Sequence, residues 1–122
     1  MREEDIQAAV VRVLQREQVA REAACVDRLL FSHPSQAHRL TRPQRIRAAA
    51  LGVRRGLLDL YISDMATLRS GIMEIKTSTG SLSPEQLAHL CCFRASGVAV
   101  AVVESAAEAE AWLRAEGFVR CA

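Results

Sequence analysis

The sequence predicts a mixed α/β domain in which a small β-sheet is flanked by helices. Segments with helical and strand-like patterns follow one another over the 122 residues in the order α, β, α, β, β, α, β, α. The strand–helix–strand passage over 71–103 favours a right-handed crossover, and therefore a parallel pair of strands. The passage over 57–77 instead predicts a hairpin, because a short turn joins its two strand-like segments. At this length we expect a single domain, 1–122.

The first half of the chain begins with an amphipathic helix. In "REEDIQAAVVRVLQREQVAREA" apolar side chains recur at helical spacing, and acids occupy the first turn. The segment "CVDRLLFSH" predicts a short strand that ends at Pro34 and the polar residues around it. The segment "TRPQRIRAAALG" starts with a Thr-x-x-Gln capping pattern and ends at Gly52, which predicts a short helix rich in arginine.

The second half contains the predicted hairpin, two helices and a buried strand. The strands "LLDLYIS" and "LRSGIMEIKTS" flank the turn-like "SDMAT". The clearest helix is "SPEQLAHLCCFRASG", with Ser83 as N-cap, Pro84 at the first position and Gly97 at the end. "VAVAVV" over 98–103 predicts a buried strand. "SAAEAEAWLRAEG" predicts a helix with a capping box from Ser105 to Glu108, and "FVR" is a candidate edge strand.

The bulk composition is that of an ordinary globular protein, with half of the residues hydrophobic and a quarter charged. No apolar run approaches the ~20 residues of a membrane span, and the N-terminus lacks a signal peptide's apolar core. We therefore expect a cytoplasmic protein without membrane contact. The four cysteines match neither a zinc spacing nor a disulfide framework, and we expect them to be reduced and mostly buried: Cys25, Cys91, Cys92 and Cys121.

Positive charge is concentrated in one third of the chain, although the net charge is only +2. No acid occurs between Asp27 and Asp59. A basic segment of this kind is typical of proteins that bind a phosphate backbone, and the charge pattern alone favours this no more than a solvated face. Its basic residues are Arg28, His33, His38, Arg39, Arg42, Arg45, Arg47, Arg54 and Arg55.

Two neighbouring strands each carry a carboxylate, Asp59 and Glu74. If the hairpin pairs 57–62 with 71–76, the two acids stand side by side, and they repel unless a proton or a cation lies between them. Mg²⁺ is suited to such a site, because it binds one or two carboxylates together with waters and phosphate oxygens. Strand alternation places Lys76 on the face of Glu74 and turns Ile75 into the core.

Lys76 is the only lysine beside fifteen arginines. An ammonium can lose its proton near other charges, whereas a guanidinium effectively cannot, which favours a catalytic function for this lysine. The alternative is that Glu74 and Lys76 form an exposed ion pair and that Asp59 is a solvated acid at a strand end.

The order of these residues resembles the VRR-NUC branch of the PD-(D/E)XK nuclease superfamily. The resemblance runs from Glu3 to Leu113 and includes "EEDIQAAVVRVLQ", "RIRAAALGVRRGLLDLYI", "GIMEIKTSTGSLSPEQLAHL" and "GVAVAVVESAAEAEAWL". It implies a restriction-endonuclease-like core. The E-x-K triplet alone is a weak signal, but its spacing from the aspartate and from the helix that carries Gln86 is specific. Two departures are Leu58, where the family has proline, and "HPSQ", where it has an Asn-Gly turn.

The resemblance also implies functions for individual residues. Asp59 and Glu74 correspond to metal-binding acids and the Ile75 carbonyl to a further ligand, with Lys76 and Gln86 in catalytic positions. An acid of the first helix completes the metal shell through water; Glu4 is our first choice and Glu3 its rival by one register. Gln86 is also the N3 residue of the Ser83 capping box, which is compatible with a place in the site. His89, on the same helix, is more typical of a core or surface histidine.

These observations predict a Mg²⁺- or Mn²⁺-dependent endonuclease that hydrolyses phosphodiester bonds in DNA. Aromatic residues make up only 4% of the chain, which favours recognition of backbone shape over stacking on single strands. Small family members resemble four-way-junction resolvases, so we expect branched duplex DNA as substrate and a homodimer with two active sites. Flanking phosphates are expected to contact Arg42, Arg45, Arg47, Arg54 and Arg55. The alternative is a catalytically silent nuclease fold that binds DNA or a protein partner.

Overall fold

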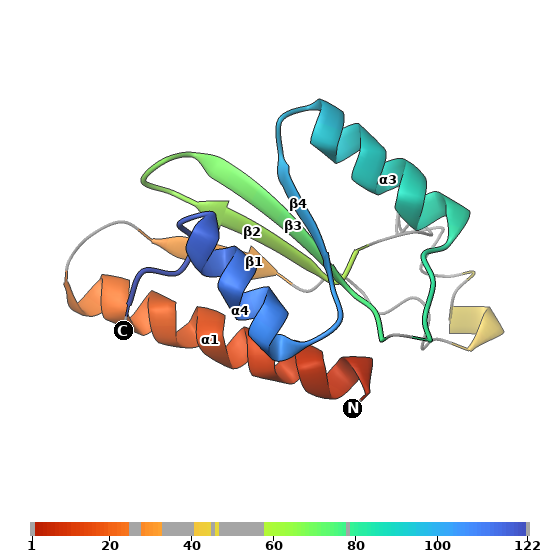
Figure 1. Cartoon of the computed structure of the whole chain (residues 1–122), viewed down its shortest axis with the longest axis horizontal. Helices are drawn as coiled ribbons and strands as arrows, with labels where there is room; N and C mark the ends of the chain where they lie inside the picture. Colours follow the sequence, from red (N-terminus) through yellow and green to blue (C-terminus); the bar gives the residue numbers. More distant parts are fainter. Residues whose placement is uncertain are drawn as a thin grey trace.

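The computed structural model describes residues 2–24, 28–32, 41–44, 46, 58–77 and 79–121. Its elements are α1 (Glu3–Ala23), β1 (Leu29–Ser32), β2 (Leu60–Asp64), β3 (Arg69–Ile75), α3 (Pro84–Ala95), β4 (Ala99–Val103) and α4 (Ala106–Ala115). Figure 1 shows the strands between α3 on one side and α1 with α4 on the other. The chain therefore has the mixed α/β fold that the sequence predicted.

The four strands form one sheet in the order β1-β2-β3-β4. Strands β1 and β2 are antiparallel, as are β2 and β3, whereas β3 and β4 are parallel. The predicted hairpin register is confirmed, since Ile62 pairs with Gly71. The ladder itself begins later than expected, at the pair of Leu60 and Met73, and extends to Asp64 and Arg69. Parallel strands need a crossover connection, and α3 supplies it between β3 and β4.

Two apolar clusters fill the space on the two faces of the sheet. The larger joins α1 and α4 to one face, and its members include Ile6, Val10, Leu14, Ile75 and Leu113. The smaller lies under α3, where Leu90 packs with Ile72 and Leu58. Alternation along β3 explains the division, because Ile72 and Ile75 point to opposite faces. The sheet is thus covered on both sides.

The predicted helix starts are confirmed where the structure describes them. Ser83 accepts a hydrogen bond from the Gln86 amide and Gln86 bonds back to the Ser83 amide, which completes a capping box. Thr41 and Gln44 make the same reciprocal pair of bonds. At α4 the Ser105 side chain caps Glu108, but the Glu108 carboxylate accepts from the amide of Glu104 instead. The rest of the helix expected over 41–52 lies largely outside the described residues.

The prediction of an edge strand at "FVR" is wrong, because residues 118–120 form an irregular segment. Phe118 and Val119 are buried in the larger cluster, where Phe118 contacts the Trp112 ring at 5.8 Å between centroids. Gly71 makes this packing possible, because a Cβ there would lie 2.7 Å from the Phe118 ring. Core burial, and not backbone pairing, therefore fixes the segment.

The expected burial of the cysteines is also wrong for the described residues. Cys91 and Cys92 are exposed on α3, and Cys121 is half-buried. All three are free thiols, as predicted, and Cys25 lies outside the described residues. Helix α3 packs against the sheet by one narrow face, around Leu90, so its other sides face solvent. None of the helices in the described parts of the chain is long and apolar enough to cross a bilayer.

A buried ionic cluster joins α1 to the hairpin and to the C-terminal segment. The Arg21 guanidinium donates to Glu17 at 2.8 Å, to Asp64 at 3.3 Å and to the Phe118 carbonyl at 2.9 Å. The second Glu17 oxygen accepts from the amides of Arg120 and Cys121, both at 2.9 Å. Burial alone would raise the pKa of Glu17, but the bonds from Arg21 and the two amides outweigh it and lower the pKa to about 2.

We expect Glu17→Gln to lower the free energy of unfolding at pH 7 by about 3 kcal/mol, because it leaves a buried guanidinium without its anion. Since the folded-state pKa lies below the ordinary 4.5, this stabilisation is present above pH 4.5 and is lost as the pH falls towards 2. The difference between parent and variant should shrink over that window in urea unfolding followed by circular dichroism.

Glu110→Gln is the matched control, because Glu110 also pairs with an arginine four positions later, Arg114, but on the surface. Its effect should stay within about 1 kcal/mol. Equal losses in the two variants would contradict a special contribution of the buried cluster.

Candidate active site at the end of strand β3

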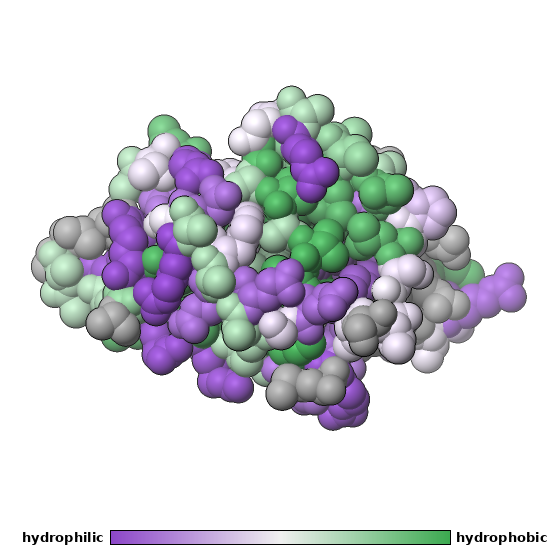
Figure 2. All heavy atoms as spheres, in the orientation of Figure 1, coloured by the Kyte–Doolittle hydropathy of each residue, from purple (hydrophilic) through white to green (hydrophobic). Residues whose placement is uncertain are grey.

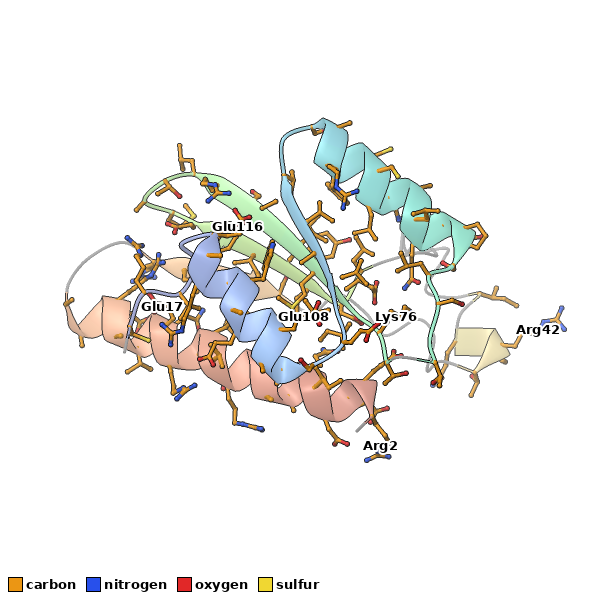
Figure 3. The ribbon with its side chains drawn as sticks, viewed as in Figure 1. Arg2, Glu17, Arg42, Lys76, Glu108 and Glu116 are labelled. Atoms are coloured by element: carbon orange, nitrogen blue, oxygen red, sulfur yellow. The ribbon has the colours of Figure 1, made fainter. Side chains whose placement is uncertain are left out.

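The predicted site residues come from four segments that meet near the end of β3. Asp59 directly precedes β2, Glu74 is the next-to-last residue of β3, and Lys76 follows that strand. Gln86 lies in the first turn of α3. Figure 3 shows Lys76 and Arg42 towards the end of the molecule where α1 begins, and Glu17 and Glu116 towards the other. The hairpin register explains the convergence, since it continues to bring Asp59 opposite Glu74.

The two acids are held within hydrogen-bonding reach of each other. The Asp59 carboxylate accepts a 2.7 Å bond from the Ile75 amide, which fixes it beside the end of β3. Glu74 is 1% exposed and bonded to Asp59. Burial raises the pKa of Glu74, and the bond and negative charge of Asp59 raise it further, to about 9; Lys76 opposes the shift and Glu3 adds to it. At neutral pH the pair therefore holds a proton when no cation is bound.

The Gln86 side chain serves the helix and the site at once. Its oxygen accepts from the Ser83 amide at 3.0 Å, and its nitrogen donates to Glu74 at 3.0 Å. The two expectations for this residue, a capping box and a place beside the acids, are therefore both met by the geometry. The cap fixes the amide orientation, because only its nitrogen can then face the carboxyl group.

Lys76 lies half-buried beside this pair. Its amide donates to the Val103 carbonyl at 2.9 Å, so the chain stays in register with β4 beyond the end of β3. Its positive charge lowers the pKa of Glu74, against the effects of burial and Asp59. The strand alternation expected for Glu74 and Lys76 thus places them close enough to interact, and the alternative of a solvent-exposed ion pair does not fit a buried Glu74.

Glu3 is the acid of α1 that bonds next to Lys76, and which of Glu3 and Glu4 completes a metal shell stays a prediction. A Glu3 oxygen accepts from the Thr77 amide at 3.3 Å, and its charge raises the pKa of Glu74. A Cβ at Gly80 would lie 3.1 Å from that oxygen and 3.5 Å from the Lys76 side chain, so the three residues are neighbours. Glu4 is exposed. Helical spacing could have shown this, since Glu3 lies three residues before the buried Ile6.

The predicted phosphate-binding arginines lie mostly beyond what the structure describes. Arg42 is exposed and extends outward in Figure 3. Arg45, Arg47, Arg54 and Arg55 lie outside the described residues. His89 is half-buried on α3. The phosphate-binding function of all five arginines therefore stays a prediction.

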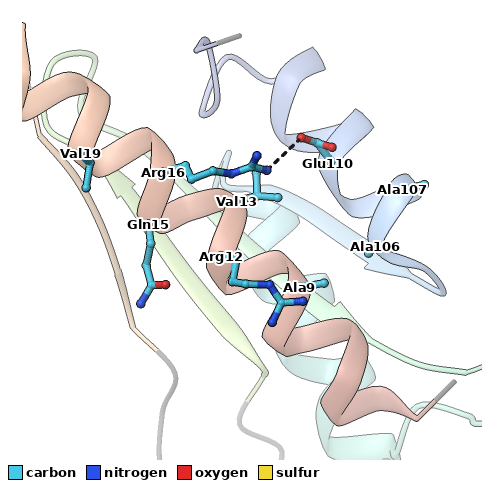
Figure 4. Close-up of a pocket in the computed structure, with 9 residues that line it drawn as sticks. All are labelled: Ala9, Arg12, Val13, Gln15, Arg16, Val19, Ala106, Ala107 and Glu110. Carbon is cyan, nitrogen blue, oxygen red and sulfur yellow. Dashed lines mark ion pairs between the residues drawn. The ribbon is translucent and has the colours of Figure 1, made fainter.

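A groove between α1 and α4 lies apart from these acids (Figure 4). It measures about 860 Å³ and is lined by apolar residues such as Val13 and Val19. Arg16 and Glu110 form an ion pair across it at 3.9 Å. None of the site residues discussed above lines this groove, so we do not assign catalysis to it.

The donor set at the acid pair suits a hard cation better than a zinc ion. Within the described ranges, no three His, Cys, Asp or Glu side chains come together as a metal centre. Zinc sites require three or four such ligands, whereas Mg²⁺ commonly binds one or two carboxylates and takes its other oxygens from water and substrate. The pKa of Glu74 is raised by burial and by the adjoining Asp59, so its carboxyl group holds a proton. A divalent cation that binds there can displace this proton.

Comparison with solved structures identifies a protein of the same fold. A structure described as a VRR_NUC domain matches with a TM-score of 0.52 at 20% sequence identity. The match covers 87% of this chain and 95% of that one. Searches with the sequence gave no match among family models or curated proteins. The chain therefore has the fold of a VRR_NUC domain, which the sequence resemblance predicted.

The raised pKa of Glu74 predicts how folding depends on pH without divalent cations. Between the ordinary value of 4.5 and about 9 the folded chain binds more protons than the unfolded chain, so stability falls as pH rises. Glu74→Gln should remove this dependence, because its amide replaces the protonated carboxyl. We expect the variant to melt several degrees above the parent at pH 8 in EDTA, and to match it near pH 4.5.

Glu85→Gln is the control, because Glu85 is exposed in the same first turn of α3. Thermal melts at half-unit pH steps would measure both variants. A constant offset of Glu74→Gln from the parent at all pH values would disprove the assigned titration.

Proposed function

We propose that the chain is a divalent-metal-dependent nuclease of the VRR-NUC type that hydrolyses phosphodiester bonds in DNA. The observation that carries the proposal is the convergence of Asp59, Glu74, Lys76 and Gln86 at one end of the sheet. The fold shared with a VRR_NUC domain supports it. A purely structural ion pair would not require a second carboxyl group beside a buried one.

The acids Asp59 and Glu74 are the proposed ligands of Mg²⁺ or Mn²⁺, together with the Ile75 carbonyl. In a strand the N–H and C=O of one residue face the same neighbour, so the Ile75 carbonyl faces the side on which Asp59 accepts from its amide. Glu3 takes the place we first gave to Glu4, at the outer edge of the site. When bound, the cation supplies a Lewis acid that withdraws charge from the phosphate and makes a water more acidic.

Three other groups of the site have separate proposed functions: the Gln86 side chain, the Lys76 side chain and the Ile75 amide. Gln86 holds Glu74 by its amide nitrogen and so orients the carboxylate. We assign to Lys76 the binding of a phosphate oxygen or the exchange of a proton with the attacking water, because it lies beside the acid pair. The Ile75 amide keeps Asp59 from turning away when its charge is uncompensated.

The substrate we propose is branched duplex DNA, recognised by its backbone. The basic segment that includes Arg42 supplies charge for phosphate contacts, and the low aromatic content does not favour stacking on single strands. Paired cuts in a four-way junction require two sites, which one chain of this size does not contain, so we propose a homodimer. A cytoplasmic location completes the proposal.

Cleavage assays test the activity. We expect the parent to cut fluorescent four-way junctions faster than linear duplex in Mg²⁺, and Lys76→Ala to lower the single-turnover rate by about 10²–10⁴-fold, because it removes the proton-transfer group. The measurement is product appearance on a denaturing gel at saturating enzyme.

Arg94→Ala is the control, because Arg94 is an exposed cation on α3, and its rate should match the parent. Equal cutting by the parent and Lys76→Ala would exclude the lysine from catalysis. If the parent binds junctions but cuts none in Mg²⁺ or Mn²⁺, the catalytically silent alternative is correct.

Calorimetry tests the cation site separately. We expect Mn²⁺ to bind the parent with an affinity that rises from pH 6 to pH 8.5, because binding displaces the proton held by Glu74. Glu74→Ala should abolish the binding heat. Glu110→Ala should bind Mn²⁺ like the parent, because Glu110 pairs with Arg16 and Arg114 in the groove between α1 and α4. Mn²⁺ binding that is unchanged in Glu74→Ala would place the cation elsewhere.

A further inference from the structure

Strand β4 is an edge of the sheet, and its open side is apolar. Among the strands of the described residues, β4 pairs with β3 alone. Val102 is 38% exposed, and Val98 and Val100 are partly buried towards α3. Figure 2 shows a green, apolar area where β4 runs beside α3 in Figure 1. Native edge strands are normally protected by lysine, proline, a bulge or a charge, and "VAVAVV" over 98–103 has none of these residues.

The backbone groups of β4 that face outward can be identified from its register. Ala99, Ala101 and Val103 pair with β3 at Gly71, Met73 and Ile75, and the Val103 carbonyl accepts from Lys76. Backbone groups of successive residues in a strand point to opposite sides. The amides and carbonyls of Val100 and Val102 therefore point away from the sheet, and no hydrogen bond reaches them from the described part of the chain.

The amides at both ends of this open stretch are hydrogen-bonded within the chain. The Val98 amide donates to the Phe93 carbonyl at 3.0 Å. The Glu104 amide donates to the Glu108 carboxylate at 3.3 Å. Within the described residues, the outward amides that stay open along β4 are thus those of Val100 and Val102. With Ala101 between them, these two residues are self-complementary in an antiparallel arrangement.

We infer that β4 pairs antiparallel with β4 of a second copy of this chain, about a twofold axis at Ala101. In this register Val100 lies opposite Val102 of the partner subunit, and each pair exchanges both of its hydrogen bonds. The four outward groups of each copy are then all satisfied. The two Ala101 residues meet at the axis as a non-hydrogen-bonded pair, where small side chains permit close approach.

The side chains agree with this register. Val100 and Val102 lie on the α3 face of β4, since they pair with Ile72 and Glu74. Across the axis they would form two β-branched pairs, which stabilise antiparallel strands. On the opposite face of β4 the residue at the axis is Ala101, with Ala99 and Val103 on either side of it.

The pairing has a consequence for the proposed nuclease, and this step alone rests on the proposed function. Glu74 lies beside Val102, so both active sites would lie near the axis and on the same face of a continuous sheet. Strand spacings place the two acid pairs roughly 20 Å apart. One face of the dimer would then present both sites to a single branched duplex.

Light scattering after size-exclusion chromatography tests the interface without DNA or metal. The parent should elute with twice the 13.4 kDa chain mass. Val102→Pro should shift the chain to monomer and raise the dissociation constant at least tenfold, because it removes an outward amide that β3 does not use. Val102→Lys should do the same, and circular dichroism verifies the fold of both.

Val19→Lys is the control, because Val19 is 65% exposed in the groove between α1 and α4 and offers the rival interface. It should remain dimeric. A monomeric parent, or dimers that Val19→Lys disrupts while both Val102 variants keep them, would overturn the proposal.

Disulfide trapping tests the register in a variant whose four native cysteines are serine. Ala101→Cys should form a linked dimer on oxidation, because the paired Cα atoms lie about 4.5 Å apart, within disulfide range. Ala99→Cys should not, because its copies lie about 13 Å apart. The reverse result disproves the axis at Ala101. Lys76→Ala should dimerise like the parent, so a failed nuclease and a failed interface are distinguishable.

Discussion

The candidate site depends on one unfavourable contact, that between the carboxyl groups of Asp59 and Glu74. The hairpin register sets the two residues opposite each other, and the Ile75 amide holds Asp59 in place. Glu74 cannot relieve the repulsion by turning into water because it is buried, and Asp59 would have to break its bond to the Ile75 amide. The pair must therefore share a proton or a cation, and this constraint gives the end of β3 its chemical character. Lys76 and Gln86 both lie beside Glu74 of this pair.

Two buried glutamates of the described residues behave in opposite ways, and the comparison shows why burial alone does not identify a site. Glu17 and Glu74 are 2% and 1% exposed. Glu17 receives bonds from a guanidinium and two amides, so its charged form is favoured and its pKa falls. Glu74 meets another acid, so its pKa rises. The first arrangement is complete in itself and stabilises the fold, whereas in the second the charge of Lys76 does not outweigh burial and the neighbouring acid.

Sequence reasoning predicted what depends on local periodicity and missed what depends on distant partners. The hairpin register followed from alternation, and the start of α3 followed from the Ser83 capping pattern. The acid of α1 that bonds to the Thr77 amide is Glu3, the rival of our first choice Glu4, and its spacing from Ile6 favours this placement. Asp64 joins Arg21 across 43 positions, a contact that no local pattern indicates. The exposed cysteines of α3 likewise depend on how narrow its packed face is.

The double use of Gln86 couples the site to the start of a helix. One end of its amide closes the capping box with Ser83, and the other holds Glu74. A Gln86 side chain that follows a moving carboxylate must release the Ser83 amide, and the first turn of α3 would then lose one of its N-terminal partners. Fraying of this helix end is thus linked energetically to the state of the acids, and a ligand that fixes Glu74 would also order the turn that begins at Pro84.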